Sequence, residues 1–82
     1  MSKPPPSIKQ VNRRFILAMY MIIAEKDGKI KYFCEKMDMG HSQISMIKTN
    51  KNNVTTEQLI KICYLFGISA EWIITGKGEM YC

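Results

Sequence analysis

One stretch near the middle of the chain decides the fold: Phe33-Cys34-Glu35-Lys36-Met37-Asp38-Met39-Gly40-His41-Ser42-Gln43-Ile44-Ser45-Met46-Ile47. Its apolar residues recur at steps of three and four, the spacing that places side chains on one face of a helix. They are Phe33, Cys34 and Met37 in the first half and Ile44 and Ile47 in the second. Met39 and Gly40 interrupt the pattern between the two halves. The stretch therefore predicts two short helices, over residues 29–37 and 41–49, that meet at a sharp turn.

Three further helices are expected around this pair. Residues 8–26 carry apolar side chains at helical spacing, with Lys9, Asn12 and Arg13 expected on the polar side, and Gly28 ends that run. Near the other end of the chain, Ser69 is a good first cap for a short helix over 70–75. No segment shows the alternation of a β-strand. The expected fold class is therefore all-α, with five compactly packed helices.

The helix over 56–66 has the clearest start signal in the chain. Thr55 and Gln58 have the spacing of a capping box, in which each side chain bonds the other residue's backbone N–H. Apolar residues cover much of the circumference of this helix. We therefore expect it to be the central helix of the core.

Length and composition limit what the chain can be. Its 82 residues suit one small domain, and a hydrophobic content of 46% is enough for a core. We expect this domain over residues 8–76, after a flexible, proline-rich arm over 1–7 and before a tail over 77–82. The net charge of +5 favours a polyanionic partner. The segment 39–56 sharpens that expectation, because it contains no Asp or Glu.

Catalysis, metal binding and membrane insertion are not expected. The chain has one histidine and three cysteines without a CxxC pair, so a zinc site is not predicted and no cofactor is expected. Cys34 and Cys63 fall on apolar helix faces and are interpreted as buried thiols in a reducing compartment. The apolar run 15–24 is too short to span a bilayer. No small-molecule ligand is evident.

The outer face of the second helix in the deciding stretch favours contact with DNA. A small helix that presents hydrogen-bonding side chains and no acid can enter the major groove. The predicted base-reading residues are His41, Ser42, Ser45 and Met46, and Gln43 is included with its direction left open. The alternative for this face is an ordinary solvated helix surface.

A second set of residues is predicted to bind DNA phosphates. The loop after a groove-reading helix commonly follows the backbone, where ammonium and amide groups donate to phosphate oxygens. In and beside that loop the candidates are Lys48, Asn50, Lys51, Asn52 and Asn53. On the other flank the candidates are Arg13, Arg14, Lys29 and Lys31, for which a solvated surface is an equal alternative.

The deciding stretch resembles the phage-repressor helix-turn-helix family, the lambda-repressor-like, Cro and XRE group. Phe33 stands at the apolar anchor of the family's second helix, and Cys34 stands at its small crossing residue. Asp38 replaces the usual glycine of the turn, which implies a left-handed aspartate. Ile30 replaces a phosphate-binding glutamine. The segment 70–80 resembles the end of repressor DNA-binding domains from Bacteroidetes phages and mobile elements.

The resemblance implies a DNA-binding transcriptional regulator, in the first place a repressor acting in the bacterial cytoplasm. One helix reads only a few base pairs, so we expect a homodimer on a pseudo-palindromic site of double-stranded DNA. Whether the pair forms in solution or only on that site is left open. The apolar end over 72–81 is the expected pairing surface. The alternative functions are an antitoxin or another protein-interaction module with the same fold.

Overall fold

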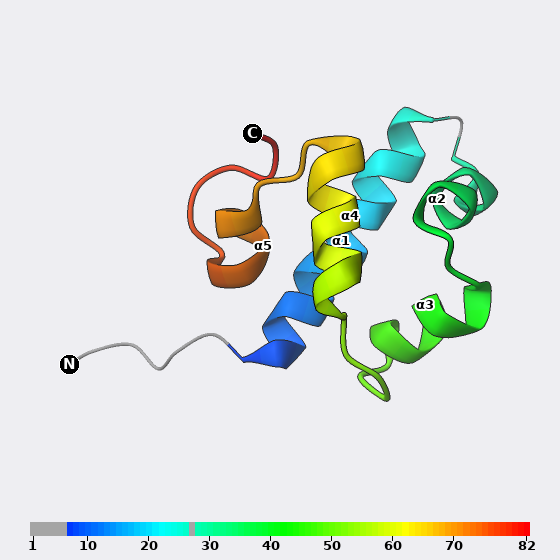
Figure 1. Ribbon diagram of the computed structural model, residues 1–82, viewed down its shortest axis with the longest axis horizontal. Coiled ribbons are helices and arrows are strands. Elements are labelled where there is room, and N and C mark those ends of the chain that lie inside the picture. The colour runs from blue at the N-terminus through cyan, green and yellow to red at the C-terminus, as the bar shows by residue number, and fades with distance from the viewer. Residues whose placement is uncertain (1–6, 27) are drawn as a thin grey trace.

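Five helices and their connections make up the part of the chain that the computed structural model describes, residues 7–26 and 28–82 (Figure 1). They are α1 (Ile8–Glu25), α2 (Ile30–Met37), α3 (His41–Lys48), α4 (Thr56–Phe66) and α5 (Ala70–Thr75). Within those ranges the only β-type pairing is an isolated antiparallel bridge between Ile68 and Tyr81. The all-helical prediction is confirmed. The expected proline-rich arm lies outside the described residues apart from Ser7.

The central helix is α1, and the prediction that α4 would take this place is wrong. α1 contacts α2, α3 and α5, and its inner face is buried from Val11 to Ile23. In α4 only Ile62 is fully buried, while Ile60 and Tyr64 are exposed. The apolar residues around α4 therefore form two faces, and within residues 7–26 and 28–82 only one of them has a partner.

The turn between α2 and α3 has the predicted geometry. Asp38 adopts the left-handed conformation, with φ 55° and ψ 48°, which aspartate tolerates better than most residues. The backbone N–H of Met39 returns to the carbonyl oxygen of Cys34 at 3.0 Å. The Met39 side chain is buried with Phe33 and Ile44 in the core. This packing fixes α3 against α2.

Side-chain caps set where the helices begin. Thr55 and Gln58 form the predicted capping box of α4, with bonds of 2.9 and 3.1 Å. Ser69 caps α5 by accepting from the backbone N–H of Trp72 at 3.2 Å. At α1 the cap is Ser7 with Gln10, a pair that has the same spacing and was not predicted. Each cap satisfies backbone N–H groups that a helix start would leave unpaired.

The last residues return to the domain. The backbone N–H of Ser69 donates to the carbonyl of Met80 at 2.7 Å, and that of Cys82 donates to Gly67 at 2.9 Å. The side chains of Met80 and Tyr81 pack, half-buried, against the core. Residues 80–82 therefore run alongside the α4–α5 connection, as the red end of the ribbon shows (Figure 1).

Candidate nucleic-acid interface

α3 presents one apolar face to the core and one polar face outward. Ile44 and Ile47 are buried, and they hold the helix against the rest of the domain. The residues on the opposite side are all exposed, as predicted, and they are His41, Ser42, Ser45 and Met46. Figure 1 shows α3 at the periphery of the bundle, on the side opposite to α5. A rod of this size with donors, acceptors and one methyl group outward matches what a major groove admits.

Gln43 is exposed, but part of its side chain is committed to the start of α3. Its Oε1 accepts a hydrogen bond from the backbone N–H of Gly40 at 2.9 Å. This bond satisfies one of the unpaired donors at the helix start. The amino group of Gln43 is the part of the side chain that remains available to a partner.

The loop after α3 is tightly folded rather than extended. The backbone N–H groups of Lys51 and Asn52 both donate to the carbonyl of Met46, at 2.8 and 3.1 Å. Asn50 adopts the left-handed conformation with φ 61°, which asparagine accepts more readily than most residues. The side chains of Asn50, Lys51 and Asn52 are exposed, as a phosphate-contacting loop requires.

Lys48 and Lys31 have partners that the sequence did not reveal. The Lys48 ammonium donates to the Tyr20 hydroxyl at 2.8 Å and lies 5.5 Å from the centre of the Tyr20 ring. The Lys31 ammonium lies 3.9 Å from a carboxylate oxygen of Glu35, one helical turn further along α2. Both lysines are solvent-exposed, and surface contacts of this kind contribute little free energy. Either side chain can therefore exchange its partner for a phosphate.

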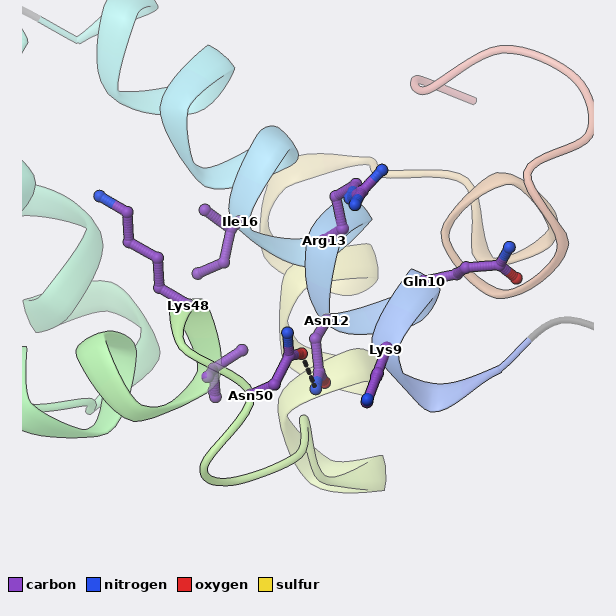
Figure 2. Close-up of a pocket in the computed structure, with 8 residues that line it drawn as sticks. Lys9, Gln10, Asn12, Arg13, Ile16, Lys48 and Asn50 are labelled. Carbon is purple, nitrogen blue, oxygen red and sulfur yellow. Dashed lines mark hydrogen bonds between the residues drawn. The ribbon is translucent and has the colours of Figure 1, made fainter.

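Three cations line an open cleft between α1 and the end of α3 (Figure 2). The cleft has a volume of about 450 Å³ and contains no carboxylate. Its lining residues are Lys9, Gln10, Asn12, Arg13, Ile16, Ile47, Lys48 and Asn50. Arg13 was predicted to bind phosphate, whereas Lys9 was not. The signal for Lys9 is its position one helical turn before Arg13.

The remaining candidates on this flank separate into two roles. Lys29 directly precedes α2 and is exposed, in a position open to a ligand. Arg14 instead ties α1 to α5, because its Nε and Nη2 donate to the carbonyls of Ile73 and Ile74 at 2.8 and 2.9 Å. Arg14 therefore holds the fold together, and Arg13 beside it is the residue that faces the cleft.

A family model described as helix-turn-helix matches residues 19–73, from the middle of α1 into α5. The chain belongs to this family. The family is the XRE type of lambda-repressor-like proteins, as the resemblance predicted, and it makes the chain a DNA-binding helix-turn-helix regulator. The match includes every predicted base-reading residue. No curated protein and no solved structure matches the chain. In the part of the chain that the structure describes, no helix has the length and apolar character to cross a membrane.

Proposed function

We propose that this helix-turn-helix protein is a sequence-specific transcriptional repressor that places α3 in the major groove of double-stranded DNA. The observation that carries this proposal is the exposed outer face of α3 together with the carboxylate-free segment around it. Bases present donors, acceptors and the thymine methyl group in the major groove, and this face matches all three. Repression follows from occupancy, because a bound protein covers DNA that a polymerase needs. Such a protein acts in the cytoplasm, where bacterial DNA lies.

Base reading is assigned to residues on the first two turns of α3. His41 and Ser42 lie at its start, where hydroxyl and imidazole groups can donate or accept. Met46 offers a thioether and methyl group to a thymine methyl. Ser45 lies between them on the same face, and Gln43 contributes its free amino group. Together these side chains can distinguish only a few base pairs.

Phosphate binding is assigned to groups on both sides of α3. Lys51, Asn50 and Asn52 follow the helix, and Lys48 is at its end. Arg13 on α1 and Lys29 and Lys31 at the start of α2 complete the set. The lysine and arginine side chains release counterions when they contact the backbone, and the asparagine amides donate hydrogen bonds to it. They fix the position of α3 without selecting a sequence.

We further propose that the protein acts as a homodimer that pairs through α4 and α5. The expected pairing segment, 72–81, gives much of its apolar surface to the core, because Trp72, Met80 and Tyr81 pack there. An exposed apolar groove of about 460 Å³ lies instead between α4 and α5, with Ile60, Tyr64 and Ile74 at its surface. A two-fold pair would present two α3 helices to half-sites about 34 Å apart and double the sequence read.

The same groove favours one alternative, a protein-interaction module such as an antitoxin. An apolar surface of this kind can bind a different protein as well as a second copy of the chain. The two functions differ in their dependence on DNA. A regulator binds duplex DNA with a steep loss of affinity as salt rises, whereas an adaptor does not.

Selection of bound sequences from a random duplex library tests the proposed function directly. We expect enrichment of a pseudo-palindrome with half-sites one helical turn apart, and affinity that falls linearly with salt on logarithmic axes. A reporter gene placed behind the selected site should then be silenced by the protein. Recovery of no enriched sequence, with weak and salt-insensitive binding, would favour the interaction module.

A further inference from the structure

Asn12 of α1 is the only polar side chain among the described residues that is fully buried, with 1% of its surface exposed. Three hydrogen bonds join it to the loop between α3 and α4. Its Oδ1 accepts from the backbone N–H of Val54 at 2.9 Å. Its Nδ2 donates to Oδ1 of Asn50 and to Oδ1 of Asn53, each at 3.2 Å. Asn12 was expected on the polar, outward side of α1, and this expectation is wrong, because Asn12 lies three and seven residues before Phe15 and Met19 and shares their buried face.

The direction of every bond in this network follows from one backbone group. The N–H of Val54 can only donate, so the oxygen of Asn12 must face it. The amino group of Asn12 is then the donor toward the loop, and it requires an oxygen from each partner. Asn50 and Asn53 must therefore turn their oxygens inward and their amino groups away from Asn12. Figure 2 shows this arrangement at Asn50.

The outward amino groups matter because phosphate oxygens only accept hydrogen bonds. Asn50 and Asn53 are both exposed, and they follow the helix that is proposed to read bases. An unrestrained asparagine presents its oxygen or its amino group to a ligand, and an outward oxygen repels a phosphate. At Asn50 the donor edge opens on the cleft that Lys9 and Arg13 line, where the charge also favours an anion.

We propose that Asn12 is a positioning residue for DNA binding, which holds Asn50 and Asn53 so that both present only donors to the phosphate backbone. The inference rests on the proposed function and adds to it. Asn12 itself does not touch DNA, since it is buried beneath the loop. It acts on the side-chain amides of Asn50 and Asn53, each of which could turn either its oxygen or its amino group outward, and it selects the outward amino group.

Asn12→Asp tests the proposal with almost no change in shape. The carboxylate still accepts from Val54 but cannot donate to the loop, so Asn50 and Asn53 must reverse and turn their oxygens outward. The matched control is Gln58→Glu, which makes the same change in net charge and keeps the capping box with Thr55. We expect Asn12→Asp to weaken binding to the selected site and to random duplex alike, about tenfold or more beyond the control.

Asn50→Asp is a second variant that keeps the network intact. Its inward oxygen still accepts from Asn12, while its outward amino group becomes an oxygen. It should fold as the wild type does and lose affinity about as much as Asn12→Asp. If the role of Asn12 is purely structural, Asn12→Asp should lower the melting temperature. Asn50→Asp should then bind DNA no more weakly than Gln58→Glu. That outcome for Asn50→Asp would overturn the proposal even if Asn12→Asp failed to fold.

A double-mutant cycle checks that Asn12 acts through Asn50. In the wild-type background Asn50→Ala should weaken DNA binding, whereas in the Asn12→Asp background it should have little further effect. Additive losses would show that the two residues act independently and would refute the proposal. A wild-type protein that binds no duplex would refute the proposed function as well, so the two failures are distinguishable.

Discussion

Arg14 joins the central helix α1 to α5, because its guanidinium donates to the carbonyls of Ile73 and Ile74 at the end of α5. The carbonyls of a last helical turn lack helical partners, and the negative end of the helix dipole favours a cation there. Arg13, one residue earlier, faces the cleft and has no such tie in the described structure. Two adjacent arginines therefore lie in different surroundings, one bonded to α5 and one lining the cleft.

We expect Arg14→Ala to lower the free energy of unfolding by about 1.5–3 kcal/mol, the range for hydrogen bonds to a charged group. Binding to the selected site should be unchanged at temperatures where the variant is folded. Arg13→Ala is the matched control, and it should weaken DNA binding and leave the melting temperature within error. Thermal denaturation followed by circular dichroism, and binding by fluorescence anisotropy, compare the two. The reverse result would show that Arg13 stabilises the fold and that Arg14 binds DNA.

Ile44→Asp should unfold the domain rather than only weaken DNA binding. Ile44 is buried on the inner face of α3, with 4% of its surface exposed. The change removes apolar packing and buries a charge that has no partner, at a cost of several kcal/mol. Ser45→Asp, on the outer face of the same helix, is the control and should remain folded. A wild-type melting temperature for Ile44→Asp would mean that α3 is rotated from the orientation described above.

Sequence selection and overall affinity should respond to different residues. Ser42→Ala and His41→Ala should each cost about 1–3 kcal/mol on the selected site and much less on random duplex, because base contacts carry discrimination. Lys51→Ala should weaken binding to both and reduce the salt slope by about one unit per protomer. Titrations on both duplexes at two salt concentrations separate these effects. If Ser42→Ala and Lys51→Ala lose the same affinity on both duplexes, the separation of base-reading from phosphate-binding residues is wrong.

Ile60→Glu should disrupt the proposed dimer without unfolding the protein. Ile60 is 62% exposed on α4, so a charge there costs the isolated domain little. In a dimer the same charge would be buried without a partner. Leu17→Glu is the control, since Leu17 is an exposed apolar residue on α1. Sedimentation with and without the selected duplex should show one protomer per site for Ile60→Glu and two for the control. Two protomers in both variants would exclude the α4–α5 groove.

The three cysteines should differ in reactivity toward a thiol reagent. Cys82 is exposed, whereas Cys34 and Cys63, which were expected to be buried, are half-buried. This partial burial raises the pKa of both thiols above the ordinary value. A raised pKa keeps both thiols protonated at pH 8, and the thiolate is the reactive form. Mass spectrometry after brief alkylation should find the label on Cys82 first, with the other two gaining reactivity as the pH rises. Equal labelling at pH 8 would show that Cys34 and Cys63 are more accessible than the folded structure allows.

The sequence by itself determined the features that depend on near neighbours in the chain. Helix starts at Thr55 and Ser69 follow from side chains that reach backbone groups three residues away. The turn at Asp38 follows from the gap between two apolar stripes. The outward face of α3 follows in the same way, because Ile44 and Ile47 leave only one orientation for the helix.

Only the tertiary structure decided which long-range partners these elements have. The bonds of Asn12 to Asn50 and of Lys48 to Tyr20 join residues far apart in the chain, and no local spacing encodes them. Its spacing from Phe15 and Met19 puts Asn12 on the apolar face of α1, but only the folded chain shows that the loop after α3 packs there and pairs with the Asn12 amide. The apolar residues of α4 likewise predicted a central helix. The sequence shows that a helix has apolar faces, but it does not show whether another element packs against each face. Burial depends on what packs against a face, and the folded chain supplies that partner.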